Sequence, residues 1–468
     1  MSTFCVNPLP NASETLDEQT SQPSRGWVWI AAFVVALGFF VSEHDVNVSK
    51  YEAFTETAEE MAASAAGGNS LRRLAFLMLG GMGLAMTAAS ARQPWRLNKP
   101  MAMALLLLFG WAMVSVLWSI DRSMCIRRLI VLGCWSVAAF GLARFFTLRQ
   151  LCWMTMLVAA SLAAVGVLSE LRLGTFRPWS PEHRFSGSLH PNSQGMLLGT
   201  LCLASLALAF DLPSYRKRCL LVFACSFGLL LLTRSRTATG ALLIAATLVA
   251  SLQISLRLKG GLAFSGLWCV GVAALLVMLL GVDLSDELQR AVMLGRQQDD
   301  ADSLSGRFLI WPEVLYYIGK RPLAGYGYET FWTADHIDAI SARLQWGLRE
   351  AHCAYLEVIL SIGVIGLGLA MLAVLCGLAT AVAEYVRSRN PLYAYIAGFI
   401  IFGLIDSLLE SGMSATSLVP FLGACALLRM AMASDGATNT VTAAESSSRN
   451  SRTQISLKQE GWKWQTQP

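Results

Sequence analysis

The sequence predicts an all-α polytopic membrane protein of about twelve transmembrane helices, with one large extramembrane loop that itself contains helices. Two observations lead to this prediction. Hydrophobic types make up 55% of the 468 residues and charged types only 14%, whereas soluble domains carry about 25% charged residues. Apolar runs close to the roughly 20 residues that cross a bilayer also recur along the whole chain.

The apolar runs alternate with connections that are mostly short. They fall at about 26–42, 74–91, 101–120, 129–146, 151–168, 192–210, 219–233, 238–256, 261–282, 353–383, 391–409 and 415–433. The seventh and eighth runs are separated by little more than Arg234-Ser235-Arg236. That pair is therefore either two helices with a tight polar turn or one helix pair broken by a re-entrant segment. Together the runs predict a transmembrane domain over residues 26–433.

Polar segments lie before, between and after these runs. Residues 1–25 lack the pattern of a secretory signal and are expected to form a polar tail. Residues 434–468 are rich in Ser, Thr and Asn, which predicts a disordered tail. The longest loop, residues 283–351, is expected to contain a helix from Ser305 to Tyr317. The other long loops are 43–73 and 169–191.

Composition also narrows the function. The net charge of +5 and the lack of a basic run interleaved with aromatics disfavour a nucleic-acid partner. Most of the 11 cysteines fall inside apolar runs and no Cys-X-X-Cys pair occurs. We therefore expect small buried side chains rather than a disulfide framework, and we predict no metal site and no cofactor.

The distribution of basic residues gives a weak indication of orientation. With the N-terminus in the cytoplasm, the short cytoplasmic turns carry 12 Lys and Arg residues and the opposite short loops carry 11. Setting aside Arg184, Arg234 and Arg236, which we interpret below as functional, changes the comparison to 12 against 8. We therefore expect both termini in the cytoplasm. All five histidines and the three long loops then lie on the opposite face.

Arginines near the predicted helix ends are the first candidates for a site. Arg184 lies in a Gly/Ser loop before the sixth run, and His190 and Asn192 follow it, although His190-Pro-Asn192 also fits an ordinary helix start. Arg234 and Arg236 lie at the bilayer boundary, where they either contact lipid phosphates or bind a substrate anion. A guanidinium presents planar donors that match phosphate oxygens.

The long loop and the helix after it add further candidates. Arg307 follows Ser305-Gly306, and His352 is expected at the N-terminus of the tenth run. The positive end of that helix dipole disfavours an imidazolium, so a neutral His352 could accept a proton, or it could simply cap the helix. Asp406 and Glu410, spaced i,i+4, are expected to support the arginines, because carboxylates at membrane depth need partners.

These residues occur in an order that is similar to the superfamily of O-antigen ligases and O-antigen and exopolysaccharide polymerases, over roughly residues 100–430. The motifs that carry the resemblance are Trp118-Ser-Ile-Asp121 with Arg127-Arg128, Arg184-Phe-Ser-Gly with His190-Pro-Asn192, Ser235-Arg236-Thr237, Ser305-Gly306-Arg307 with Trp311, Gly325-Tyr-Gly-Tyr328 with Phe331-Trp332, and Ala351-His352 with Tyr355-Leu356, Gly363 and Gly366. Cys353 stands where the family usually has Asn after the histidine.

The resemblance implies a metal-independent, inverting glycosyltransferase in a bacterial inner membrane, with its long loop in the periplasm. Its donor would be an oligosaccharide on undecaprenyl pyrophosphate. Arg184, Arg236 and Arg307 would bind the pyrophosphate and His352 would act on the acceptor hydroxyl. Arg234, His190, Asn192, Asp406 and Glu410 would support them. Membrane lipid, a flippase and chain-length regulator proteins are the other partners implied.

Three functions remain open at this point. A polymerase would join exopolysaccharide or O-antigen repeat units, and the Gly-Tyr-Gly-Tyr string and Glu410-Ser411 favour it. A ligase would pass the glycan to lipid A core. A polysaccharide transporter or flippase would need polar residues along a path near the bilayer midplane, and the sequence has few.

Overall fold

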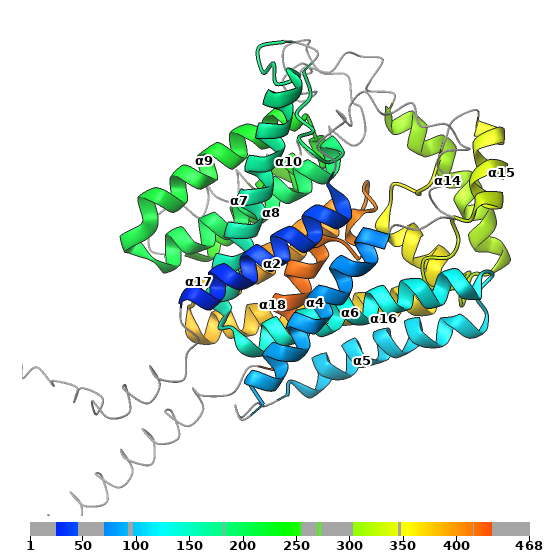
Figure 1. Cartoon of the computed structure of the whole chain (residues 1–468), viewed down its shortest axis with the longest axis horizontal. Coiled ribbons are helices and arrows are strands. Elements are labelled where there is room, and N and C mark those ends of the chain that lie inside the picture. The colour runs from blue at the N-terminus through cyan, green and yellow to red at the C-terminus, as the bar shows by residue number, and fades with distance from the viewer. Residues whose placement is uncertain are drawn as a thin grey trace, which may run out of the picture.

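The computed structural model describes residues 25–44, 70–91, 97–180, 183–253, 268, 271–272, 303–344, 348–414 and 416–432. Within these ranges every regular element is a helix, and most of the helices pack into one bundle (Figure 1). The predicted fold class, an all-α polytopic membrane protein, is confirmed.

The described helices follow the predicted apolar runs closely. The bundle helices are α2 (Arg25–Glu43), α4 (Ser70–Ala89), α5 (Lys99–Val114), α6 (Arg122–Phe145), α7 (Leu148–Leu173), α8 (Pro191–Asp211), α9 (Arg216–Thr233), α10 (Arg236–Gln253), α16 (Ala354–Ser388), α17 (Pro391–Asp406) and α18 (Leu418–Ala431). Two helices of the long loop are α14 (Ser303–Lys320) and α15 (Ala334–Leu344), so the helix expected from Ser305 to Tyr317 is confirmed.

The described residues account for only part of the twelve membrane spans that the sequence predicts. Among the described residues, 8 helices are long and apolar enough to cross a membrane, and α17 and α18 are shorter apolar helices. The run predicted at 261–282 lies almost wholly outside the described residues. So do the tails, apart from Arg25 at the start of α2. The count of twelve therefore stays a prediction.

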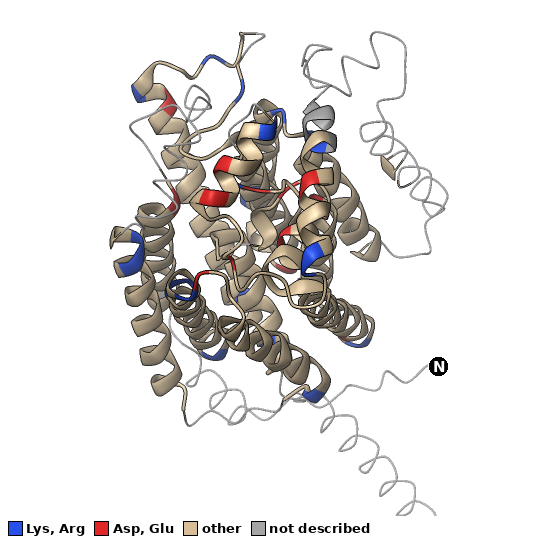
Figure 2. Ribbon diagram, turned by 90° about the vertical axis from the view of Figure 1, so that its right-hand side faces the viewer, with Lys and Arg blue, Asp and Glu red and all other residues tan. Residues whose placement is uncertain are grey.

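One end of the bundle, here called the loop end, gathers the long connections. His44, which follows α2, has its Nδ1 2.7 Å from the hydroxyl of Ser188 in the connection between α7 and α8. The Trp118 indole, between α5 and α6, donates to the Ala324 carbonyl after α14 at 2.8 Å. Charged residues occur mainly near helix ends and loops, and the lengths of the bundle helices carry few (Figure 2).

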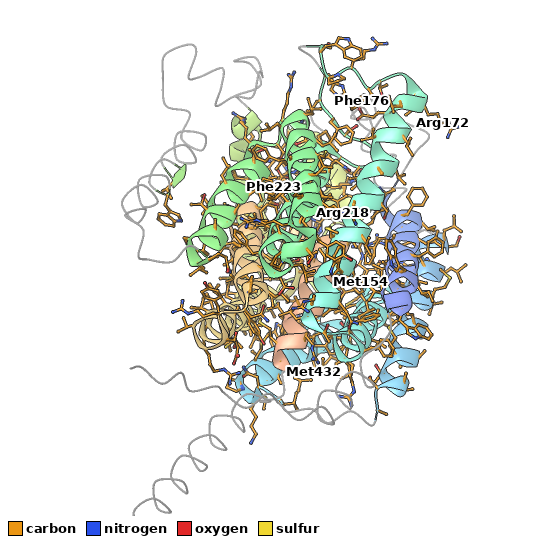
Figure 3. The ribbon with its side chains drawn as sticks, turned by 90° about the vertical axis from the view of Figure 1, so that its left-hand side faces the viewer. Met154, Arg172, Phe176, Arg218, Phe223 and Met432 are labelled. Atoms are coloured by element: carbon orange, nitrogen blue, oxygen red, sulfur yellow. The ribbon has the colours of Figure 1, made fainter. Side chains whose placement is uncertain are left out.

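The opposite end holds the short turns. Arg149 at the start of α7 pairs with Asp211 at the end of α8, at 2.6 Å. Figure 3 shows the alternation of the helices directly, because Arg172 in the last turn of α7 and Met432 after α18 lie at opposite ends of the bundle. Antiparallel neighbours of this kind follow from connections too short to cross the bundle.

The turn at Arg234-Ser235-Arg236 joins two separate helices, which settles the alternative left open by the sequence. Arg234 caps α9 in the left-handed conformation, with a φ of 52°, and α10 begins at Arg236. Ser235 lies directly against Gly195 of α8, where a Cβ would come within 2.9 Å of the serine Cβ. Helix α9 therefore ends and α10 begins against α8, and the turn lies at the loop end.

The long helix α16 is interrupted where the long loop packs on it. Gly363 has a φ of 73°, so its backbone leaves the helical path. The Val364 N–H donates to the Pro322 carbonyl at 2.9 Å, and the Tyr326 N–H donates to the Leu360 carbonyl at 2.8 Å. Backbone groups released by the break are thus satisfied by the loop, as burial requires. The break fixes the segment after α14 against the first turns of α16.

Helices α4 and α6 approach each other closely through glycines. A Cβ placed on Gly141 of α6 would clash with the backbone of Gly83 in α4, and a Cβ on Gly83 would clash with the backbone at Val137 and Ala138. Small residues that allow such backbone contact are a common means of helix association in membranes. The N-terminal half of the bundle therefore has no room for even a methyl group at this crossing.

We expect Gly141→Ala to destabilise the protein by about 1–3 kcal/mol, because overpacking forces two helix backbones apart. The matched control is Gly133→Ala on the same helix, where an added Cβ meets nothing within 4 Å. The measurement is the thermal unfolding midpoint of the purified protein in detergent. Equal midpoints for the two variants would contradict the close contact between α4 and α6.

Candidate functional site

Four polar side chains from separate segments join in one hydrogen-bonded chain at the loop end. Arg184 precedes α8, Asn192 lies in its first turn, Arg307 lies near the start of α14 and Glu410 follows α17. Arg184 Nη2 donates to Asn192 Oδ1 at 2.6 Å, and Asn192 Nδ2 donates to Glu410 Oε1 at 2.7 Å. Arg307 Nη2 pairs with that same Oε1 at 2.6 Å. We call these four side chains the arginine–glutamate network.

The network is largely shielded from solvent. The side chains of Arg307 and Glu410 are 15% and 12% exposed. Burial raises the pKa of Glu410, whereas Arg307 and His352 favour the carboxylate and act in the opposite direction. Removing one partner from such a pair would leave an uncompensated charge. Glu410 therefore fixes the Arg307 guanidinium in position.

The position of Arg184 depends on the end of α9. Its Nε donates to the carbonyl of Thr233 at 2.9 Å, and the N–H of the next residue, Phe185, donates to the Leu232 carbonyl at 2.8 Å. The Phe185 ring is fully buried. The guanidinium is therefore held from two sides, by a helix C-terminus and by Asn192.

A buried carboxylate holds the rest of the Arg184 loop. Glu170, in the last turn of α7 and only 2% exposed, accepts hydrogen bonds from the backbone N–H groups of Ser186 and Gly187 at 2.8 and 2.7 Å. His183 Nε2 lies 3.7 Å from the other carboxylate oxygen. Burial lowers the pKa of His183; Glu170 opposes that shift and Arg234 reinforces it. The loop is thus tied to α7 as well as to α9.

His352 lies beside the network, just before α16. Its backbone has a φ of 48°, a left-handed conformation unusual for a histidine, and its Nδ1 is 3.2 Å from Glu350 Oε1. The N–H of Ala354 donates to the carbonyls of both Ser407 and Glu410 at 3.0 Å. The segment that carries the imidazole is therefore fastened to the turn that carries the network carboxylate. A carboxylate near Nδ1 favours the tautomer in which Nε2 can accept a proton.

A second carboxylate supports the unusual backbone at His352. Glu357, in the first turn of α16, accepts hydrogen bonds from the Ala351 N–H and from the Trp332 indole at 2.9 Å. The Trp311 indole donates to the Ala351 carbonyl at 3.2 Å. Contacts from α14 and α16 thus converge on Ala351, the residue before His352, and the loop residue Trp332 holds Glu357 in place. Left-handed backbone at a non-glycine residue persists only where surrounding contacts hold it.

The other predicted site residues take different places. Arg236 begins α10 half-buried, three positions after the Thr233 carbonyl that Arg184 contacts. Arg234 caps α9, and its charge helps to lower the pKa of His183. His190 caps α8, because its Nδ1 accepts the Asn192 N–H at 3.2 Å. The structure therefore gives His190 the ordinary helix-start geometry that the sequence had left open.

Asp406 is buried next to the network without being bonded into it. Its side chain lies within electrostatic range of Arg307 and Glu410. Its carboxylate oxygens make no hydrogen bond within the described residues. Asp406 and Glu410 were both expected to support the arginines. Glu410 pairs with Arg307, whereas Asp406 is a buried neighbour of that pair.

Sequence reasoning missed three carboxylates that shape the site: Glu170, Glu350 and Glu357. Glu170 and Glu357 each stand within a turn of the end of an apolar helix, where a carboxylate needs partners, so their positions alone were a usable signal. Glu350 is half-exposed in a loop and carries no such signal. Metal-ligating clusters of His, Cys, Asp and Glu are also absent from the part of the chain that the structure describes.

The described helices and this site define a class of protein: a multi-pass membrane protein with a buried arginine–carboxylate site at one end of its bundle. Residues 221–371 match the family model described as O-antigen ligase. This segment includes Arg236, Arg307 and His352 and covers just under a third of the chain. The match supports the resemblance to the O-antigen ligase and polymerase superfamily that the motifs predicted. Comparison with curated proteins gives no match.

The family match supports a glycosyl-transfer enzyme of the ligase or polymerase type in general terms. Its substrates are then a lipid-linked glycan and an acceptor. Arg184, Asn192 and Glu410 lie outside the matched residues, and yet they form one network with Arg307, which lies inside it.

The network gives a first test of the site. We expect Glu410→Ala to destabilise the protein by about 3 kcal/mol or more, because it leaves the Arg307 guanidinium buried without its partner. The matched control is Glu313→Ala, which breaks a pair with Arg343 whose side chains are 23% and 46% exposed. That loss should cost about 1 kcal/mol or less.

Thermal unfolding midpoints of the two variants in detergent decide the question. The double variant Arg307→Met/Glu410→Met should recover part of the loss, because no unpaired charge remains buried. Midpoints that fall equally in the Glu410 and Glu313 variants would show that the network does not anchor this end of the bundle.

Proposed function

We propose that this protein transfers a glycan from a polyprenyl-pyrophosphate carrier, undecaprenyl pyrophosphate, to an acceptor hydroxyl at the periplasmic face of a bacterial inner membrane. The observation that carries the proposal is the arginine–glutamate network beside His352. The network and His352 together bring two guanidinium groups and one imidazole to the loop end of a membrane bundle. Such a site suits an anionic headgroup that presents a sugar from the outer leaflet.

The proposed chemistry needs two kinds of group. The acceptor oxygen attacks the anomeric carbon while its proton passes to His352 Nε2, and the bond from that carbon to the pyrophosphate oxygen breaks. The electron pair leaves on the pyrophosphate, whose developing charge is stabilised by Arg184, Arg307 and, from the start of α10, Arg236. A single displacement of this kind inverts the anomeric centre. No step in this scheme requires a metal ion.

The network prepares the arginines for this role. A guanidinium carries five N–H donors, and Arg307 uses one of them for Glu410. The pair therefore holds the group in place while donors remain for phosphate oxygens. Preorganised donors of this kind cost no reorganisation when charge develops.

The choice between polymerase and ligase rests on the acceptor. We favour polymerisation of exopolysaccharide or O-antigen repeat units, because the Gly-Tyr-Gly-Tyr segment and Glu410-Ser411 resemble polymerases. The family description names ligases, so transfer to lipid A core is the second candidate.

The network lies at helix ends rather than along a path through the bundle, which argues against a transporter. We expect a flippase and a chain-length regulator as partners of this protein.

Replacing His352 tests the proposed base. Asn tolerates the left-handed backbone that this position adopts, so His352→Asn removes the imidazole with little strain. We expect normal protein abundance and a fall in transfer rate of about 10²- to 10⁴-fold, the range for general acid–base catalysis. The measurement is transfer from a synthetic polyprenyl-pyrophosphate oligosaccharide by purified protein, with Asp338→Ala on the exposed side of α15 as the control.

The assay is run in excess chelator, where the wild-type protein should remain active. A strict need for a divalent ion would remove the metal-independent scheme, and an undiminished rate in His352→Asn would remove His352 from it. These two results are independent of each other.

A deletion strain distinguishes the two acceptors. We expect single repeat units on the carrier lipid to accumulate, because a lost polymerase leaves them unjoined. The readout is the chain length and linkage of extracted lipid-linked glycan, compared with a strain complemented by the wild-type gene. Long polymer that is not attached to lipid A core would indicate a lost ligase and overturn the preference for polymerisation.

A further inference from the structure

Two of the motifs singled out in the sequence take no part in the arginine–glutamate network. Trp118-Ser-Ile-Asp121 lies between α5 and α6, and Gly325-Tyr-Gly-Tyr328 lies between α14 and α15. The structure brings them together: the Ile120 N–H donates to the Tyr326 carbonyl at 3.1 Å, and Arg321 Nη1 donates to the Trp118 carbonyl at 3.2 Å. Their junction forms one wall of an open cavity of about 440 Å³.

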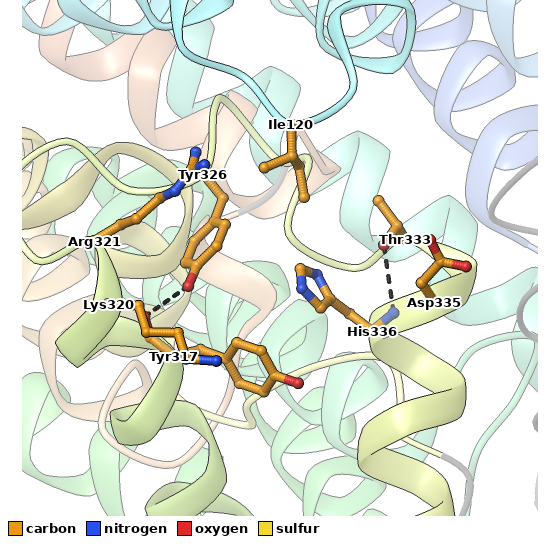
Figure 4. Close-up of a pocket in the computed structure, with 8 residues that line it drawn as sticks. All are labelled: Ile120, Tyr317, Lys320, Arg321, Tyr326, Thr333, Asp335 and His336. Carbon is orange, nitrogen blue, oxygen red and sulfur yellow. Dashed lines mark hydrogen bonds between the residues drawn. The ribbon is translucent and has the colours of Figure 1, made fainter.

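The cavity lies between the long loop and the connection from α5 to α6, outside the bundle helices. The residues that line it are Ile120, Tyr317, Lys320, Arg321, Tyr326, Thr333, Asp335 and His336. Its volume falls within the range of about 300–1,000 Å³ that is usual for small-molecule sites. Figure 4 shows the rings of Tyr317, Tyr326 and His336 pointing into one space, with Thr333 and Asp335 along one side.

The floor of the cavity is held together by contacts among its own residues. The Tyr326 hydroxyl donates to the Tyr317 carbonyl at 2.8 Å, and the His336 ring stacks on Phe331 with its centroid 4.6 Å away. His336 Nδ1 lies 2.6 Å from the Phe331 carbonyl, which can only accept, so Nδ1 carries the proton. In the neutral ring Nε2 is then an acceptor. The floor is therefore apolar and aromatic, with one fixed polar position.

The rim is polar and reaches solvent. Lys320 and Arg321 are exposed and donate only, Asp335 is exposed and accepts only, and Thr333 does both. Lys320 Nζ lies 4.1 Å from the centre of the Tyr316 ring and 5.0 Å from that of Tyr317, so its charge lies at the edge of the cavity. An aromatic floor with donors and acceptors at its edge matches a sugar ring, which has apolar C–H faces and a belt of hydroxyls. Two cations against one carboxylate favour sugars that carry an acidic group.

The cavity is linked to the proposed transfer site. Phe331 packs under His336, and the next residue, Trp332, donates to Glu357, which also holds the Ala351 N–H beside His352. We propose that this cavity is a saccharide-binding subsite, which holds sugar units of the glycan beyond the one that reacts. The inference rests on the proposed function for its substrate and deepens it. Donor and acceptor glycans share this chemistry, so the test separates them.

Direct binding tests the subsite without requiring transfer. The probe is an oligosaccharide fragment released from the producing cell's own surface glycan, titrated into the full-length protein in nanodiscs. We expect Lys320→Ala/Asp335→Ala to weaken binding about tenfold or more, the loss that corresponds to one hydrogen bond with a charged group. The matched control is Asp338→Ala on the same helix, which lies outside the cavity and should bind like wild type.

Each result bears on one claim. Equal affinities in the double variant and in Asp338→Ala, or no binding by the wild-type protein, would overturn the subsite. Cavity-dependent binding in a protein that fails to transfer glycan would keep the subsite and overturn the proposed function. Where transfer is measured, a raised KM for the lipid-linked donor alone assigns the cavity to the donor chain, and a raised KM for the acceptor alone assigns it to the acceptor.

Discussion

The packing at the loop end of this protein depends on the hydrogen bonds that the Glu410 carboxylate accepts. One of its oxygens accepts hydrogen bonds from Asn192 and Arg307, and the asparagine in turn holds Arg184. Segments more than 200 positions apart in the chain are therefore fixed by one buried atom. Because a buried charge without a partner costs several kcal/mol, the packing of α8, α14 and α17 at this end has little freedom to change.

Two further carboxylates hold neighbouring loops in place, and each accepts hydrogen bonds from a different kind of donor. Glu170 accepts from backbone N–H groups, and Glu357 accepts from an indole and a backbone N–H. All three stand where an apolar helix meets a loop. A chain with 14% charged residues thus places several carboxylates where they order irregular backbone. That order gives Arg184 and His352 defined positions beside a membrane, where mobile loops would not.

The sequence predicted the helices and several residues of the site. It did not predict the contacts between residues that are distant in sequence. Apolar runs predicted the bundle because lipid requires length and hydrophobicity that can be read locally. Arg184 and Arg307 could be proposed from residue type and position at predicted helix ends. The role of Glu410 as a junction and the break at Gly363 could not, since each depends on a partner that only folding brings close.

The arrangement also explains how a cationic site can exist before its substrate arrives. Guanidinium groups facing each other at a bilayer boundary would repel and draw in lipid headgroups. Glu410 instead gives Arg307 a neutralising partner, and Asn192 gives Arg184 a polar one. In the proposed donor complex, a diphosphate would add to the network without displacing the carboxylate, because Arg307 gives only one of its five donors to Glu410. The resting structure and the proposed donor complex would therefore share one geometry, which is the condition for electrostatic preorganisation.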